Sequence, residues 1–134
     1  MFNKVIIIDD STFDRKLTER VISKYSFAAQ VTTFHSATDA LAYLHSVENK
    51  PDEFPGMIFL DIYMPVMNGF EFLDKYMELP EKAREHCAVI MISSTFRIED
   101  SERASRYPAV KKFLYKPFSE QMLAELEELY ALNV

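Results

Sequence analysis

The feature that most constrains this chain is a series of short apolar runs, each followed at once by a polar side chain of a type found in catalytic and metal-binding sites. The runs and the residues that follow them are 5–8 with Asp9 and Asp10, 57–60 with Asp61, 89–92 with Ser93, and 113–115 with Lys116. If the runs are parallel strands, their carboxyl ends lie at one edge of a sheet. The pattern therefore predicts that these polar groups, far apart in the sequence, meet in one site.

Apolar runs of strand length alternate with segments of helical periodicity along the chain. The expected strands are residues 4–8, 30–34, 57–60, 88–92 and 110–115. A helical pattern follows each of them, which gives five strands and five helices. Strict alternation predicts an α/β fold with a doubly wound, parallel, five-stranded sheet, helices on both faces and right-handed crossovers.

Capping residues mark the expected helix boundaries. Ser11, Ser36 and Ser119 each precede a helical pattern and are expected N-caps. The fourth helix is expected over residues 97–106, and Pro108 ends it. In the first helix we expect one apolar face, formed by residues at four-residue spacing: Phe13, Leu17, Val21 and Tyr25.

Composition limits the class of protein. With 134 residues, 49% hydrophobic and 27% charged, the chain is expected to form one domain over residues 1–134, with no output domain. The net charge of −6 argues against direct nucleic-acid binding. The apolar runs are far shorter than the ~20 residues that span a bilayer, so we expect no membrane association. The single Cys87 cannot form an internal disulfide, which fits a cytoplasmic protein.

Carboxylates gathered at one strand edge predict a bound cation, because like charges repel unless a proton or cation lies among them. Mg²⁺ takes one or two protein carboxylates and keeps positions for water and phosphate oxygens. Asp10 and Asp61 are the expected ligands, with Asp9 in contact with the ion or just behind it. The backbone carbonyl of Tyr63 could supply a further oxygen. The alternative, in which Asp9 and Asp10 merely begin a loop, leaves the second acidic strand end unexplained.

Asp61 is the expected nucleophile in phosphoryl transfer, since a carboxylate can attack a phosphoryl group to give an acyl phosphate. Lys116 would neutralise phosphoryl charge, and Ser93 would donate a hydroxyl hydrogen bond. Because Lys116 precedes Pro117, the peptide bond between them can be cis, which would aim the lysine side chain into the site. Asp61, Lys116 and Ser93 form the expected catalytic set.

Four sequence strings make the chain resemble the receiver domains of two-component response regulators. They are IIIDDS at residues 6–11, DIYMPVMNG at 61–69, ISS at 92–94 and FLYKPF at 113–118. Each string is moderately specific alone, whereas all four at this spacing are highly specific and cover nearly the whole chain. The resemblance implies a flavodoxin-like fold with strand order 2-1-3-4-5.

The resemblance also implies a signalling phosphoacceptor rather than an enzyme, one that catalyses only its own phosphorylation and dephosphorylation. A sensor histidine kinase or a histidine phosphotransfer protein would phosphorylate Asp61 with Mg²⁺, and Asp9 and Asp10 would be the acidic metal pair. Ser93 and Phe113 match the switch positions. Phosphorylation would then remodel the surface of the fourth helix, fifth strand and fifth helix. That surface would contact a downstream protein target and could form a homodimer.

Some positions depart from the family pattern. Phe113 lacks the hydroxyl of the more usual tyrosine, and Ser93 lacks the β-branching of the commoner threonine. Ala109 stands where the family usually has glycine, so the backbone there must find another path. Tyr63 and Thr95 occupy positions that influence how water reaches the acyl phosphate in receivers. The bulk of Tyr63 predicts slower hydrolysis than a Tyr63→Ala variant would show; the alternative is a surface aromatic that only lines the cleft.

Two other functions would use parts of the same residue set. A phosphatase of the haloacid dehalogenase type also combines an aspartate nucleophile, a lysine and Mg²⁺. It needs a second aspartate two residues after the nucleophile, where this chain has Tyr63, and usually a cap domain as well. The other alternative is a receiver scaffold that binds partners without phosphorylation. The intact set of Asp10, Asp61, Ser93 and Lys116 argues against it.

Overall fold

The computed structural model describes residues 2–131, which form five strands and six helices. In chain order they are β1 (Phe2–Ile8), α1 (Thr12–Lys24), β2 (Ala28–Phe34), α2 (Ala37–Ser46), β3 (Met57–Asp61), α3 (Gly69–Tyr76), α4 (Glu81–Arg84), β4 (Ala88–Ser93), α5 (Ile98–Ala104), β5 (Val110–Tyr115) and α6 (Glu120–Ala131). The strands pair in parallel in the order β2-β1-β3-β4-β5. The predicted flavodoxin-like topology is confirmed.

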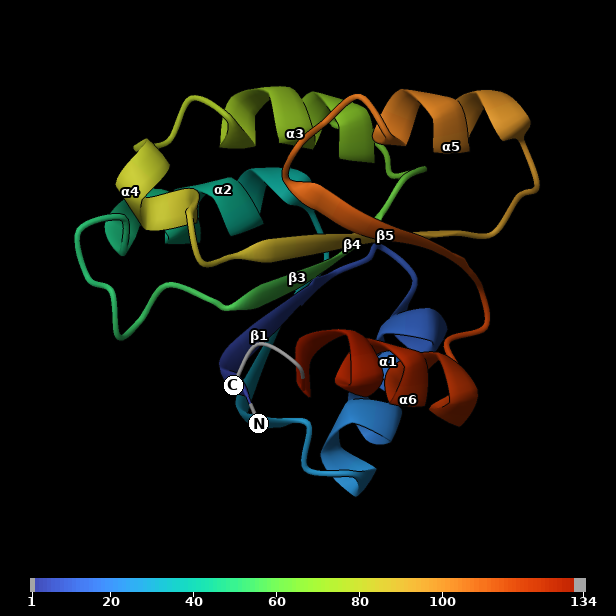
Figure 1. Ribbon diagram of the computed structural model, residues 1–134. Helices are drawn as coiled ribbons and strands as arrows, with labels where there is room; N and C mark the ends of the chain where they lie inside the picture. The colour runs from blue at the N-terminus through green and yellow to red at the C-terminus, as the bar shows by residue number, and fades with distance from the viewer. Residues whose placement is uncertain (1, 132–134) are drawn as a thin grey trace.

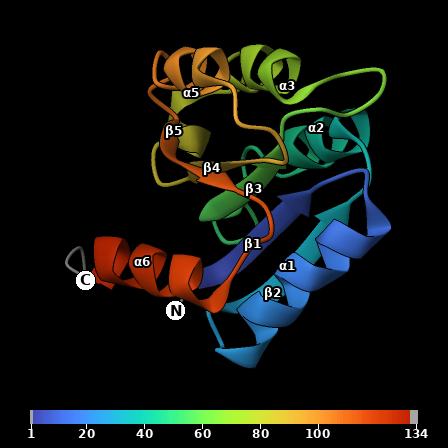
Figure 2. The same cartoon turned by 90° about the vertical axis from the view of Figure 1, so that its right-hand side faces the viewer.

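Helices cover both faces of the sheet. α2, α3 and α5 lie on one face, and α1 and α6 lie on the other (Figure 1 and Figure 2). Successive residues of the central strand β3 alternate between the two layers. Ile58 and Leu60 join the core under α2 and α3, whereas Met57 and Phe59 join the core under α1 and α6. Burial on both faces explains why this strand is apolar at each of these positions.

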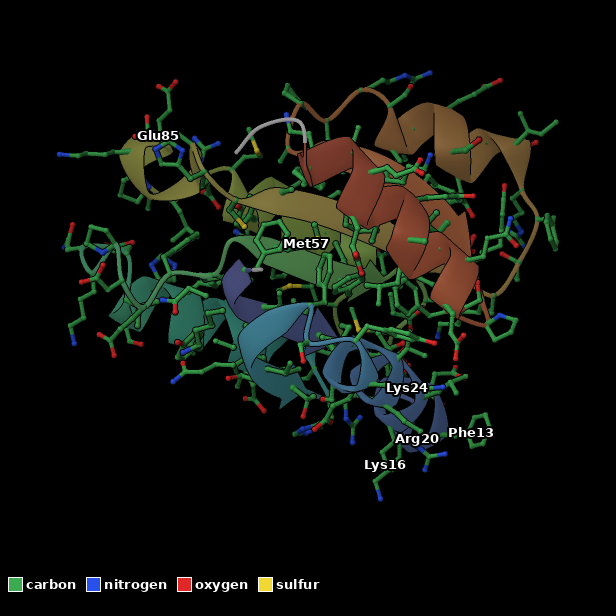
Figure 3. All side chains as sticks on the ribbon, turned by 60° about the horizontal axis from the view of Figure 1, so that its bottom comes forward. Phe13, Lys16, Arg20, Lys24, Met57 and Glu85 are labelled. Carbon is green, nitrogen blue, oxygen red and sulfur yellow. The ribbon has the colours of Figure 1, made fainter. Side chains whose placement is uncertain are left out.

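The buried face of α1 agrees only in part with the one expected from the sequence, since Val21 packs against the core whereas Phe13 and Tyr25 do not. Phe13 is 76% exposed and Tyr25 is also exposed, whereas the buried residues of this helix are Thr18 and Ile22. An α-helix turns about 100° per residue, so each four-residue step overshoots a full turn by about 40°. Over three steps, Phe13 and Tyr25 drift onto different faces. The outer side of α1 carries Phe13 together with the basic residues Lys16, Arg20 and Lys24 (Figure 3).

Two helices rather than one connect β3 to β4. The charged stretch before β4 contains α4, a single turn that begins beside Pro80. The fourth and fifth helices expected from the sequence are therefore α5 and α6 in the structure. α5 ends at Ala104, before the expected residue 106, and Ser105 is its C-cap.

The three expected N-caps are confirmed. The hydroxyls of Ser11, Ser36 and Ser119 each accept a hydrogen bond from the backbone N–H three residues later, at 3.2 Å in every case. These bonds satisfy donors that the first turn of a helix leaves free. The cap at Ser11 fixes the start of α1 directly after Asp9 and Asp10.

The chain passes Ala109 without the left-handed backbone that favours glycine. Ala109 is not among the described non-glycine residues with positive φ. Instead, the register between β4 and β5 shifts so that pairing passes from Val110 to Lys112 and skips Lys111. A bulge of this kind adds twist at the end of a strand.

The segment between β3 and α3 closes tightly at Gly69. The N–H of Gly69 donates to the carbonyl of Ile62 at 2.7 Å, and a capping box between Asn68 and Glu71 starts α3. A Cβ at Gly69 would lie 2.6 Å from the carbonyl oxygen of Asp61 and 3.0 Å from Cα of Ile62. Both are backbone atoms of the strand end that carries the site. Glycine is therefore required by this close approach.

We predict that Gly69→Ala lowers the free energy of unfolding by about 1–3 kcal/mol, because the backbone around Asp61 must shift to admit the methyl group. Gly56→Ala is the matched control. Its Cβ would meet the side-chain ring of Phe2 at 2.8 Å, and a ring can rotate away. Urea unfolding of both variants measures the difference. Equal losses in the two variants would show that the strand end yields as easily as a side chain.

Candidate functional site

The polar groups that follow the strands lie together at the carboxyl edge of the sheet. Asp9 follows β1, Asp61 ends β3, Ser93 ends β4 and Lys116 follows β5. β1 and β3 are direct neighbours in the sheet, as are β4 and β5. The N–H of Lys116 donates to the carbonyl of Ser93 at 2.8 Å, which fixes the lysine backbone beside the end of β4. The fold thus assembles one site from four distant segments.

Three carboxylates form an acidic cluster in this site. One oxygen from each of Asp9, Asp10 and Asp61 lies within 4.8 Å of the other two. Asp9 and Asp61 are buried and Asp10 is exposed, so the cluster opens toward solvent on one side. Oxygen ligands in this number fit Mg²⁺, which binds carboxylates and retains waters. The carbonyl of Tyr63, two residues beyond Asp61, stays a predicted ligand.

Lys116 contacts three carboxylates. Its Nζ lies 2.9 Å from Oδ2 of Asp9, 2.9 Å from Oδ2 of Asp14 and 3.3 Å from Oδ1 of Asp61. Burial lowers the pKa of Lys116, but its hydrogen bonds to Asp9 and Asp14 and the charge of Asp61 outweigh burial and place this pKa above its ordinary value. The lysine is therefore a fixed positive charge within the site. The Lys116–Pro117 peptide bond is cis, the isomer that the sequence indicated as possible.

Asp14 is a site residue that the sequence reasoning missed. It lies in the first turn of α1, and its Oδ2 accepts a hydrogen bond from Nζ of Lys116 at 2.9 Å. Its position in the sequence offered a signal, because it stands one helical turn beyond Asp10 on a helix that begins at the site edge. A first-turn aspartate is ordinarily interpreted as a helix-terminus charge, which hides a second role.

The charge balance of the cluster is unfavourable without a cation. Burial, followed by the charge of Asp9, raises the pKa of Asp61 to about 7, although Lys116 opposes both effects. Near neutral pH, Asp61 therefore carries a proton part of the time in the metal-free protein. A divalent cation among the carboxylates would favour the ionised form, which is the form that acts as a nucleophile.

Ser93 is fully buried, and its hydroxyl is engaged by its own loop. The hydroxyl donates to the carbonyl oxygen of Thr95 at 3.0 Å and accepts from the N–H of Thr95 at 3.1 Å. The predicted switch hydroxyl and the predicted hydrolysis-tuning residue thus contact each other directly. Any movement of the Ser93 side chain toward Asp61 must break this local pair.

Tyr63 connects two loops across the mouth of the site. Its hydroxyl donates to a carboxylate oxygen of Asp100 in α5, and the guanidinium of Arg97 lies 5.7 Å from the centre of its ring. The side chain is 42% exposed. Tyr63 therefore links the loop after Asp61 to the start of α5, which the sequence did not indicate.

Phe113 is half-buried and belongs to a row of aromatic rings at the edge of the sheet. Its ring meets Tyr115 edge-on at 5.4 Å, and Tyr115 stacks on the exposed ring of Phe96 at 4.2 Å. Phe96 lies in the loop that follows Ser93. The expected switch residue is thus joined to the site loop through Tyr115, two residues further along β5.

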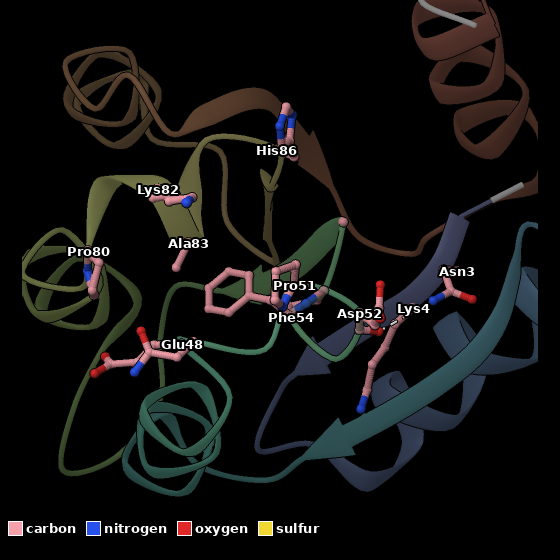
Figure 4. A pocket seen from close by; sticks show the side chains of 13 residues that line it. Asn3, Lys4, Glu48, Pro51, Asp52, Phe54, Pro80, Lys82, Ala83 and His86 are labelled. Atoms are coloured by element: carbon pink, nitrogen blue, oxygen red, sulfur yellow. Dashed lines mark hydrogen bonds between the residues drawn. The ribbon is translucent and has the colours of Figure 1, made fainter.

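Other candidate groups lie away from this cluster. Burial raises the pKa of the Cys87 thiol to about 12, so this cysteine behaves as a core residue. A pocket of about 540 Å³ lies at the opposite edge of the sheet, between the start of β1, the loop after α2, and α4 (Figure 4). Its lining is of mixed charge, with Lys4 and Lys82 near Glu48 and Asp52. None of the acidic-cluster residues lines it.

The sequence matches the response regulator receiver domain over residues 5–127. The chain therefore belongs to the receiver domain family of two-component response regulators, and its cluster of Asp9, Asp10 and Asp61 fits the phosphoacceptor site of that family. Membership in this family favours a receiver over the phosphatase that shares its residue types. None of the helices within residues 2–131 is long and apolar enough to cross a membrane.

Similar proteins include a bacterial methylesterase, a plant response regulator and a bacterial receiver protein of known structure. The chain is 36% identical over 132 residues to protein-glutamate methylesterase/protein-glutamine glutaminase 3 of Burkholderia thailandensis, covering 95% of this chain and 33% of that protein. It is 35% identical over 130 residues to the two-component response regulator ARR15 of Arabidopsis thaliana, covering 93% and 61%. The crystal structure of a response regulator receiver protein from Dyadobacter fermentans superposes with a TM-score of 0.83 at 37% identity, covering 96% and 97%. The chain thus spans under two thirds of the length of both sequence relatives.

We predict a pH-dependent stability difference between the wild type and Asp61→Asn in metal-free buffer. The folded-state pKa of Asp61, about 7, lies above the ordinary value of 3.8, so folding favours the protonated form. The wild type should lose stability as pH rises from about 4 to about 7, and the variant should lack this loss. The variant should gain about 2–3 kcal/mol relative to the wild type between pH 5 and pH 8.

Urea unfolding at both pH values, with a chelator present, measures this difference. Asp52→Asn, which removes an exposed carboxylate in the loop before β3, is the control and should follow the wild type. Parallel stability curves for the wild type and Asp61→Asn would show that Asp61 stays ionised without a cation.

Proposed function

We propose that this chain accepts a phosphoryl group on Asp61 from a phosphohistidine of a sensor histidine kinase or histidine phosphotransfer protein, and signals to a downstream protein. The observation that carries the proposal is the convergence on Asp61 of two further carboxylates and the amine of Lys116. A nucleophilic carboxylate, a cation site and a fixed positive charge are what phosphoryl transfer to aspartate requires.

The proposed metal site is formed by Asp9, Asp10, Asp61 and the carbonyl of Tyr63. Bound there, Mg²⁺ would supply positive charge to the phosphoryl oxygens. An oxygen of Asp61 attacks the phosphorus atom while the bond from phosphorus to the donor imidazole nitrogen breaks, and the electron pair stays on that nitrogen. Lys116 donates to a phosphoryl oxygen, and Ser93 can supply a second hydrogen bond once its hydroxyl turns from Thr95.

Signalling would follow from the movement of Ser93. A phosphoryl group adds roughly two negative charges and three acceptor oxygens, which can compete with Thr95 for the Ser93 hydroxyl. Space vacated by that hydroxyl would let the half-buried ring of Phe113 move inward, and burial of such a ring contributes about 1.5–3 kcal/mol. The surface of α5, β5 and α6 would then change and bind the target or a second copy of the chain.

Release of the phosphoryl group would be the only other reaction of the domain. Water attacks the acyl phosphate, inorganic phosphate leaves, and Asp61 returns to its carboxylate form. Tyr63 and Thr95 lie at the mouth of the site and would control the approach of that water. We propose no reaction on any further substrate, and we place the whole chain in a single receiver domain.

The first test is intact mass after incubation with acetyl phosphate, with and without Mg²⁺. We expect one phosphoryl adduct that requires Mg²⁺ and is absent from Asp61→Asn, because that amide is a poor nucleophile. Amide NMR of the phosphorylated protein should show changes over α5, β5 and α6, and these should shrink in Phe113→Ala. If the wild-type protein gains no mass and binds no beryllofluoride with Mg²⁺, the proposal is wrong. The chain would then be a receiver scaffold that binds partners without phosphorylation.

We further predict that Tyr63→Ala hydrolyses its acyl phosphate severalfold faster than the wild type, because the ring and its bond to Asp100 shield the approach of water. Tyr63→Phe keeps the ring and removes only the hydroxyl, so its rate separates steric shielding from the connection to α5. The decay of the adduct after removal of phosphodonor gives the rates. An unchanged or slower rate in Tyr63→Ala would exclude this role.

A further inference from the structure

The amine of Lys116 contacts carboxylates from two strand ends and from the first turn of α1. An ammonium group has three N–H donors, and three carboxylates surround this one at hydrogen-bonding or ion-pairing distance: Asp9, Asp14 and Asp61. The contacts to Asp9 and Asp14 are the shorter pair, at 2.9 Å each. The contact to Asp61 is longer, at 3.3 Å.

Asp14 differs from the other two carboxylates in origin and surroundings. Asp9 and Asp61 belong to the acidic cluster that could hold a metal ion, and Asp14 does not. Asp14 lies in the first turn of α1, where its backbone N–H donates to the Ser11 hydroxyl. Its side chain is 31% exposed, whereas the side chain of Lys116 is 12% exposed. The amine is therefore held between the sheet edge and the helix start.

Phosphorylation would engage two of the three carboxylates that contact Lys116, namely Asp61 and Asp9, in other bonds. With Asp61 bonded to phosphorus and Asp9 committed to a cation, the amine would keep Asp14 as the partner that the reaction leaves unchanged. A long flexible side chain loses rotamer freedom when it is ordered, which costs free energy. A partner that orders Lys116 before the phosphoryl group arrives removes this loss from the reaction step.

We propose that Asp14 is a positioning residue that holds the amine of Lys116 for phosphoryl transfer to Asp61. The inference rests on the proposed function, and it adds a carboxylate from α1 to the site. Asp14 touches neither phosphorus nor the metal position in this arrangement, and it acts through Lys116. Its loss should slow phosphorylation without removing the nucleophile or the metal ligands.

The test compares initial rates of phosphorylation by acetyl phosphate at saturating Mg²⁺. Asp14→Ala should be about tenfold slower than the wild type, the loss expected for one charge-assisted hydrogen bond. Asp14→Asn, which keeps an acceptor oxygen, should be affected less. Asp39→Ala is the matched control, because Asp39 has the same place in the first turn of α2 and the same bond to its N-cap Ser36. It should retain the wild-type rate.

A double-mutant cycle shows whether Asp14 acts through the lysine. In a Lys116→Ala background, Asp14→Ala should cause no further loss, because the amine that it positions is absent. A tenfold loss that persists in this background would overturn the proposal, and so would an Asp14→Ala rate at or above that of the wild type. Urea unfolding of each variant confirms that rates are compared between folded proteins.

A second readout does not depend on phosphorylation. In the resting protein, the ¹⁵N signal of the Lys116 amine should be observable in the wild type and in Asp39→Ala at low temperature, and lost in Asp14→Ala. If the wild type forms no phosphoryl adduct, the proposed function fails, and this signal still decides whether Asp14 anchors the amine. An unchanged signal in Asp14→Ala would overturn the anchoring.

Discussion

The contact of one ammonium group with three carboxylates is the interaction on which the site depends. Four acidic side chains lie at or beside this strand edge, and their mutual repulsion would open it unless positive charge were fixed among them. Lys116 supplies that charge from the end of β5, and its ion pair with Asp14 connects the site to α1. The same group therefore balances the charge of the resting site and, under the proposed function, would also bind a phosphoryl oxygen on Asp61.

The sheet delivers these groups because it is covered on both faces. Ile58 to Leu60 of β3 alternate between two cores, so the strand cannot slip by one residue without turning every side chain to the wrong layer. Gly69 then holds the following loop against the backbone of Asp61. Apolar packing over the whole domain thus determines the position of the Asp61 carboxylate.

Sequence pattern predicted the features that depend on chain order. Parallel strands, their order and the edge at which Asp9, Asp61, Ser93 and Lys116 meet all follow from alternation and a family resemblance. The pattern did not predict contacts between side chains of different elements, such as Asp14 with Lys116 or Tyr63 with Asp100. These pairs have no fixed spacing. The expected face of α1 was wrong at its two ends, Phe13 and Tyr25, because a four-residue interval only approximates the 3.6 residues of a helical turn.

The hydrogen bonds between the Ser93 hydroxyl and Thr95 have a consequence for the unphosphorylated protein. Two hydrogen bonds, each with a net value of about 0.5–1.5 kcal/mol, favour the turned-away hydroxyl. Their sum corresponds to a ratio of roughly 5 to 150 between the two conformers. If Ser93 acts as the proposed switch, the unmodified protein would adopt the conformer with the hydroxyl turned from Thr95 for a small fraction of the time. Under that proposal, the hydrogen bonds between Ser93 and Thr95 would set the background signalling of the unphosphorylated protein.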